Sequence, residues 1–108
     1  MQYDSAETVE EAVHLLSRGE NDVFPLAGGT DLLPQVRTGR IAPARVVDLK
    51  RIPELREIVE SEDGYRIGAA VSGAELGEHS GLLADWPGVV EAAELIGSTQ
   101  IQGRASLG

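Results

Sequence analysis

The chain has 108 residues, 42% hydrophobic and 25% charged, a balance typical of a globular domain rather than a disordered or collagen-like chain. Its formal net charge of −9 disfavours nucleic acid and anionic membrane surfaces as partners, because both require clustered Lys and Arg. The absence of cysteine excludes disulfides, thiolate catalysis and an iron–sulfur cluster held by this chain. No apolar run approaches the ~18 residues of a membrane span, and no secretion signal opens the sequence, so we expect a cytoplasmic protein.

Helical spacing of apolar residues predicts an amphipathic helix over residues 5–19, with Thr8 in a capping box and Gly19 as its stop. A strand over residues 21–27 follows, and a glycine loop then leads into a helix over residues 31–37. This order indicates α/β winding.

The β-branched run 45–49 predicts a buried strand parallel to the first, and residues 52–55 predict one helical turn that starts with a proline. Asp63-Gly64 lies between two β-prone runs and predicts a hairpin that adds an antiparallel ribbon to the sheet. Ser72 opens a short helix, and residues 87–96 predict another.

The glycine loop is the strongest local signal for binding. Gly28 and Gly29 permit positive φ and leave no Cβ in the way, so a flat or charged ligand can approach the main chain. Thr30 or Asp31 can cap the helix that follows, with its free N–H groups directed at the loop, which suits a phosphate. The loop lacks both the Gly-Lys-Ser/Thr of a Walker loop and the spaced glycine triplet of dinucleotide folds, so a plain strand-to-helix turn is an equal alternative.

A second polar, glycine-punctuated segment occupies residues 98–108 and resembles another ligand loop. Arg104 in this segment can contact phosphate, or it can pair with one of the many carboxylates. Such a loop normally leads into a further element, so we expect the sequence to be a fragment.

Catalytic and metal-binding patterns are absent from the sequence. His14 and His79 lie far apart and outside any ligand spacing, so we expect no metal site. We assign no catalytic residue, and we interpret Trp86 as a packing residue.

Several segments together resemble the FAD-binding subunit or domain of molybdenum hydroxylases, of the xanthine dehydrogenase and carbon monoxide dehydrogenase type. The resemblance covers nearly the whole chain and rests on residues 8–12, 26–34, 47–49, 52–55, 67–72 and 97–101. The Ala-Gly-Gly block followed by the Ile-Gly-Ala-Ala block is specific in combination.

The resemblance implies an α/β (α+β) fold, the N-terminal lobe of a vanillyl-alcohol-oxidase-type FAD-binding domain, with a small mixed sheet and flanking helices. It implies FAD as the cofactor, with its pyrophosphate wrapped by the glycine loop and further contacts from the C-terminal segment. The implied cofactor-binding residues are Leu26, Ala27, Gly28, Gly29, Thr30, Asp31, Leu32, Leu33, Ile101, Arg104, Ser106, Leu107 and Gly108. In the usual C-terminal motif, Ile-Arg-Asn-Arg-Gly-Thr-Ile-Gly-Gly-Asn, this chain keeps the hydroxyl as Ser106 and the first glycine as Gly108.

The resemblance also implies a place in an oxidoreductase complex. FAD would receive electrons from [2Fe-2S] clusters of a small partner subunit, which a molybdopterin-binding large subunit reduces, and would pass them to NAD⁺ or another acceptor. Residues 1–108 would be the N-terminal part of the FAD-binding domain, truncated at its C-terminus. The alternative is a small α/β scaffold or anion-binding module without flavin.

Overall fold

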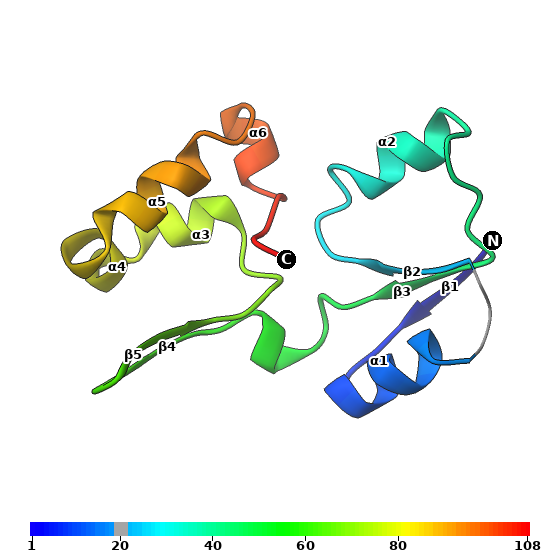
Figure 1. The fold of residues 1–108 in the computed structure, drawn as a ribbon, viewed down its shortest axis with the longest axis horizontal. Coiled ribbons are helices and arrows are strands. Elements are labelled where there is room, and N and C mark those ends of the chain that lie inside the picture. Colours follow the sequence, from blue (N-terminus) through cyan, green and yellow to red (C-terminus); the bar gives the residue numbers. More distant parts are fainter. Residues whose placement is uncertain (19–21) are drawn as a thin grey trace.

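The computed structural model describes residues 1–18 and 22–108, which form two units with the C-terminus between them (Figure 1). The N-terminal unit contains β1 (Gln2–Ser5), α1 (Val9–Leu16), β2 (Val23–Leu26), α2 (Leu32–Arg37) and β3 (Arg45–Asp48). The turn η1 (Pro53–Leu55) leads to the C-terminal unit, which contains β4 (Ile58–Ser61), β5 (Gly64–Ile67), α3 (Gly73–Glu78), α4 (Ser80–Asp85), α5 (Pro87–Glu94) and α6 (Thr99–Gln102).

A parallel sheet of order β1-β3-β2 forms the middle of the N-terminal unit. The strand β3 is central and its Val46 and Val47 are buried, as expected for β-branched residues in a parallel sheet covered on both faces. The helices α1 and α2 lie on opposite sides of this sheet (Figure 1). The three strands end at the same edge, with Ser5 and Leu26 both paired to Asp48, so the segments that follow them start side by side.

The C-terminal unit has its own sheet and its own core. The hairpin of β4 and β5 is a separate two-stranded sheet, so the predicted ribbon forms without joining the parallel sheet. Helices α3, α4 and α5 pack together over it, around a buried cluster of Val71, Leu76, Leu82, Val90 and Ala93. The N-terminal unit has a different core, which contains Ala6, Ala12, Val47 and Ile52.

The predicted helix over residues 5–19 is too long at its start. Residues Gln2–Ser5 form the edge strand β1, and the helix begins at Val9 after Thr8, whose Oγ1 accepts a hydrogen bond from the Glu11 N–H at 3.0 Å. The strand β1 is an edge strand that pairs with β3 only, and edge strands can be short and polar. Residues 2–5 therefore lack the apolar alternation by which a strand is predicted from sequence. Gly19, the predicted stop, and residue 21, the predicted strand start, lie outside the described residues.

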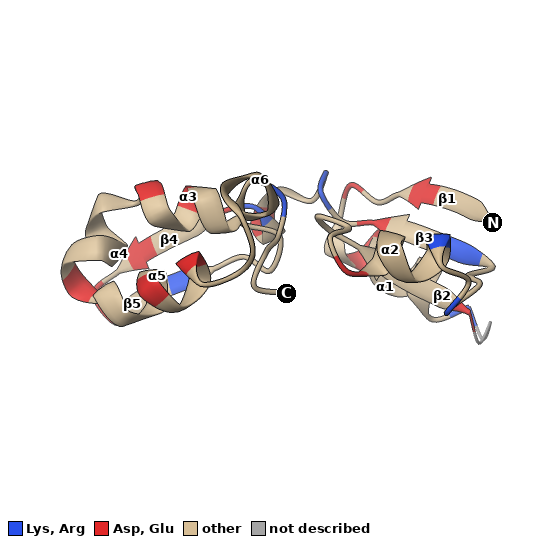
Figure 2. Cartoon of the chain, turned by 90° about the horizontal axis from the view of Figure 1, so that it is seen from above, with Lys and Arg blue, Asp and Glu red and all other residues tan. Residues whose placement is uncertain are grey.

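The net negative charge is concentrated in the C-terminal unit, because Asp and Glu occur in both units (Figure 2) but Lys and Arg are scarce in this one. Residues 57–108 contain nine Asp and Glu and only two basic residues, Arg66 and Arg104. Most Lys and Arg therefore belong to the N-terminal unit and to the segment that joins the two units.

Candidate functional site: a cleft between two loops

The glycine loop and the C-terminal loop touch through their backbones. A Cβ added to Gly28 would lie only 1.9 Å from the Arg104 carbonyl oxygen, so this contact requires glycine. The C-terminal loop is held in turn by the α3 segment, because the Gly73 N–H donates to the Ala105 carbonyl at 2.8 Å. The Gly108 N–H also donates to the Ala69 carbonyl, at 3.0 Å.

These two loops line an open cleft of about 470 Å³, within the usual size range of cofactor pockets. The glycine loop contributes half of the lining residues, Ala27 to Leu32, and the C-terminal loop contributes Ser106 and Gly108. The full lining is Phe24, Pro25, Ala27, Gly28, Gly29, Thr30, Asp31, Leu32, Gln35, Ile41, Ser106 and Gly108.

A run of unpaired backbone donors belongs to the residues that line this cleft. Within residues 1–18 and 22–108, the N–H groups of residues 28–32 donate to no other residue, whereas the Leu33 N–H donates to the Gly29 carbonyl at 3.2 Å. Gly29 has a φ of +77°, which turns the chain sharply at the middle of this run. Successive free N–H groups in such a turn can bind the oxygens of a phosphate.

The predicted cap of α2 is only half correct. Asp31 occupies the position before the helix, but its carboxylate accepts a hydrogen bond from Gln35 Nε2 at 2.7 Å and caps no backbone N–H. The side chain therefore accepts no hydrogen bond from the loop donors. That leaves these donors available to a ligand.

The predicted cofactor-binding residues fall into two groups. Ala27 to Leu32, Ser106 and Gly108 line the cleft. Leu26 is buried at the end of β2, and Leu33 packs against Gly29 from the helix. Ile101 packs against Gly97, which has a φ of +58°.

Arg104 and Leu107 lie at other hollows of the same loop. Arg104 lines a smaller hollow of about 100 Å³ behind Gly28, together with Lys50 and Arg56. Residues 98–108, predicted to form a ligand loop throughout, include the short helix α6, which Ser98 caps through its Oγ.

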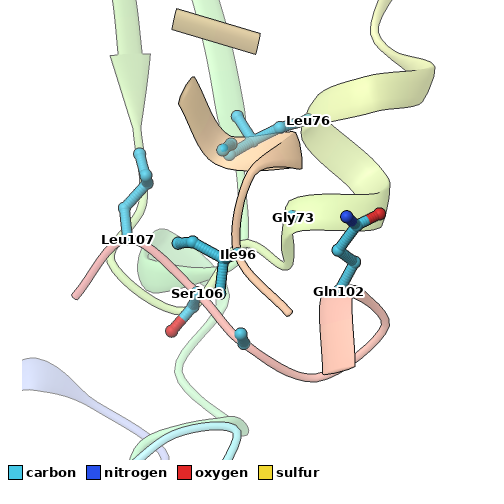
Figure 3. A pocket seen from close by; sticks show the side chains of 8 residues that line it. Gly73, Leu76, Ile96, Gln102, Ser106 and Leu107 are labelled. Atoms are coloured by element: carbon cyan, nitrogen blue, oxygen red, sulfur yellow. The ribbon is translucent and has the colours of Figure 1, made fainter. Parts of the chain in front are cut away.

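Leu107 lines a hollow of about 10 Å³ between the C-terminal loop, α3 and the segment after α5, where Leu76 and Ile96 also lie (Figure 3). A space of this size has room for no more than about one water molecule. It is a packing gap under the loop, and Leu107 lies at its rim with 52% of its surface exposed.

Phe24, Pro25, Gln35 and Ile41 line the cleft without having been predicted. Gln35 follows Asp31 by four residues, so helical spacing could have placed it on the same side. Phe24 and Pro25 precede the glycine loop on β2 and gave no polar signal. Ile41 reaches the cleft from the chain after α2, and only the tertiary fold brings it there.

A buried carboxylate lies at the C-terminal end of the central strand β3, beside the residue of β2 that precedes the glycine loop. Asp48 is 6% exposed and accepts hydrogen bonds from the Tyr3 hydroxyl and from the Lys50 backbone N–H, the latter at 2.9 Å. Burial alone would raise the pKa of Asp48, but the hydrogen bonds from Tyr3 and Lys50 and the Lys50 charge lower it below its usual value. The hydrogen bond to Asp48 raises the pKa of the Tyr3 phenol. Asp48 is therefore ionised at neutral pH.

In the part of the chain that the structure describes, no three His, Cys, Asp or Glu side chains are grouped so that they could hold a metal ion. His79 instead caps α4, with Nδ1 accepting from the Leu82 N–H at 3.1 Å, and His14 lies on α1. None of the described helices has the length and apolar character to cross a bilayer, since the longest, α1 and α5, have eight residues each.

Comparison with known proteins agrees with this geometry. The family model described as the FAD binding domain in molybdopterin dehydrogenase matches residues 1–108. The chain is 36% identical over 107 residues to the carbon monoxide dehydrogenase medium chain of Hydrogenophaga pseudoflava, covering 99% of this chain and 37% of that one. It is also 36% identical over 107 residues to the xanthine dehydrogenase FAD-binding subunit of Escherichia coli O157:H7, covering 98% and 36%.

A solved structure supports the same assignment. A crystal structure of the Cu,Mo-CO dehydrogenase in its cyanide-inactivated form superposes with a TM-score of 0.95 at 32% identity, and the match covers 100% of this chain and 38% of that one. The chain thus spans little more than a third of the length of these relatives. The predicted family, fold class and FAD cofactor are confirmed. The chain belongs to the family of FAD-binding domains of molybdopterin dehydrogenases.

Proposed function

We propose that this chain supplies the pyrophosphate-binding part of the FAD site in an electron-transfer subunit of a molybdenum hydroxylase. In this proposal residues 1–108 are the N-terminal part of the FAD-binding domain. The whole subunit takes electrons from [2Fe-2S] clusters of a small partner subunit and passes them to NAD⁺ or another acceptor. The clusters are themselves reduced by a molybdopterin-binding large subunit, and we place the complex in the cytoplasm.

The observation that carries the proposal is the run of free N–H groups from Gly28 to Leu32 along the cleft. In a chain with a net charge of −9, a diphosphate must be held by local donors, because the overall field repels it. Ser106 lines the same cleft from the other loop and adds a hydroxyl. FAD, when bound, supplies the redox chemistry, and this chain binds and orients it.

The family membership supports flavin over the alternative of a scaffold or anion-binding module without flavin. The names of the relatives also support assembly into a complex, since they include a medium chain and an FAD-binding subunit.

The first test is the flavin content of the full-length gene product, coexpressed and purified with its partner subunits. We expect stoichiometric FAD, measured by visible flavin absorption and by analysis of the released cofactor. A complex that purifies intact and without FAD would refute the proposal.

Two glycines give a matched pair of variants for the loop. Gly29 and Gly39 have nearly equal φ values of +77° and +75°, so alanine strains the backbone similarly at both, by about 1 kcal/mol or more. Gly39 lies outside the cleft, with no atom within 4 Å of an added Cβ. We expect Gly29→Ala to lower FAD content and Gly39→Ala to leave it unchanged, whereas equal FAD content in the two variants would count against the loop.

A further inference from the structure

Lys50 ties the glycine loop to the edge of the parallel sheet. Its ammonium group donates to the Ala27 carbonyl oxygen at 2.9 Å and lies 3.0 Å from Asp48 Oδ1. Ala27 directly precedes Gly28 and is 23 residues away from Lys50 in the sequence. The contact thus joins the start of the glycine loop to the segment that leaves β3.

Asp48 holds the Lys50 ammonium group in place. Asp48 is buried and is fixed by the Tyr3 hydroxyl from β1 and by the Lys50 backbone N–H. A buried carboxylate with these partners has little freedom to turn, so it orients the lysine that pairs with it. Lys50 keeps 44% of its side-chain surface exposed, which means that its role is not the filling of a core.

The carbonyl that Lys50 holds has no other donor in residues 1–18 and 22–108. The peptide plane that carries the Ala27 carbonyl also carries the Gly28 N–H, because the peptide bond is planar. Fixing the carbonyl therefore fixes the direction of the first N–H in the run of free donors along the cleft.

We propose that Lys50 is a positioning residue for the FAD pyrophosphate. Its ammonium group bridges the Ala27 carbonyl and Asp48, and this bridge fixes the direction of the Gly28 N–H and the conformation of the loop that follows. This inference rests on the proposed function, because it assigns Lys50 a part in that same site. Lys50 does not itself line the cleft that holds the proposed ligand. Its effect on FAD passes through the loop.

The test removes the ammonium group of Lys50 and keeps an unbranched side chain of similar length. We expect Lys50→Met, in the full-length gene product purified with its partners, to raise the dissociation constant of FAD by about tenfold, the effect of losing one charge-assisted hydrogen bond. Affinity is measured by titrating FAD into cofactor-free protein. The matched control is Arg51→Met, which removes an equal charge from the next residue and no hydrogen bond to the loop.

If Lys50→Met and Arg51→Met weaken FAD binding equally, the proposal is overturned, because the loss would then be a long-range effect of charge. Unchanged affinity in Lys50→Met would overturn it as well. The proposed function fails differently, through a wild-type complex that contains no FAD at all.

Two further variants separate positioning from a general loss of stability. Lys50→Arg keeps a charged donor and should bind FAD more tightly than Lys50→Met, and equal weakening in both would exclude the hydrogen-bond role. Asp48→Asn combined with Lys50→Met should weaken FAD no more than the stronger single variant, because the two residues act on the loop as one unit. Fully additive effects would contradict that.

Discussion

At the scale of single residues, Gly28 is the point on which the cleft depends. The expectation from sequence was that a Cβ there would block a ligand, whereas the structure places the Arg104 carbonyl oxygen where that Cβ would lie. Gly28 is required first for the contact between the two loops. The ligand surface is a consequence of that contact.

We therefore expect Gly28→Ala to destabilise the FAD-free protein by about 1–3 kcal/mol, as for overpacking at a site where backbone must move. The measurement is denaturant unfolding without FAD. Gly88→Ala is the control, because nothing lies within 4 Å of a Cβ at Gly88. If Gly28→Ala is as stable as the control in the absence of FAD, the loop contact does not form in solution.

At the scale of elements, Tyr65 links the hairpin to the helices above it. The Tyr65 hydroxyl donates to Asp85 Oδ2 at 2.6 Å, and its ring meets the His79 ring edge-on with centroids 5.9 Å apart. Tyr65 belongs to β5, while His79 and Asp85 flank and end α4. One side chain thus fixes a strand to the helix that follows α3.

The hydrogen bond to Asp85 raises the pKa of the Tyr65 phenol, with burial and the charges of Asp85 and Glu60 acting in the same direction. The folded pKa exceeds the unfolded value of about 10, so this link is complete below pH 10 and is lost as pH rises through the folded pKa. We expect Asp85→Asn to lower the Tyr65 pKa in an absorbance titration, with Tyr3, the other tyrosine, unaffected. An unchanged titration curve would show that the Asp85 contact is absent in solution.

The sequence predicted the elements that have a strong local signal. The parallel pairing of β2 and β3 follows from short β-branched and apolar runs, and Thr8 and Ser72 cap their helices as their positions in the sequence indicated. The strand β1 was missed because Gln2–Ser5 is polar and owes its conformation to pairing with β3. Local propensity is weak where a tertiary partner decides the conformation.

The candidate site was predicted in the same uneven way. The residues of the glycine loop line the cleft. They could be identified from sequence because a pair of adjacent glycines directly indicates an unusual backbone conformation. Lys50 gave no such signal, since a lysine after a strand is ordinary and its partner Ala27 is 23 residues away. The sequence suggested Arg104 as a phosphate contact because of its charged side chain, whereas in the structure its backbone carbonyl makes the contact between the two loops.

At the scale of the whole molecule, the two units have separate cores and meet at few points. One core surrounds Val47 and Ile52, and the other surrounds Leu76 and Leu82. The units are joined by the chain around η1, by the contact of Gly28 with the Arg104 carbonyl, and by close packing of Gly68 on the Leu55 backbone. The cleft lies at this junction, so a ligand there would contact both units.

We expect the FAD-free 108-residue chain to unfold in two steps, because little buried surface couples the cores. Trp86, the only tryptophan, lies between α4 and α5 and reports the C-terminal unit, while far-ultraviolet circular dichroism follows both units. The two signals should give different denaturant midpoints. The matched control moves the probe: with Trp86→Phe and Phe24→Trp, fluorescence follows β2 and should shift to the other midpoint. Coincident transitions in both proteins would mean that the contacts between the two units make them one cooperative domain.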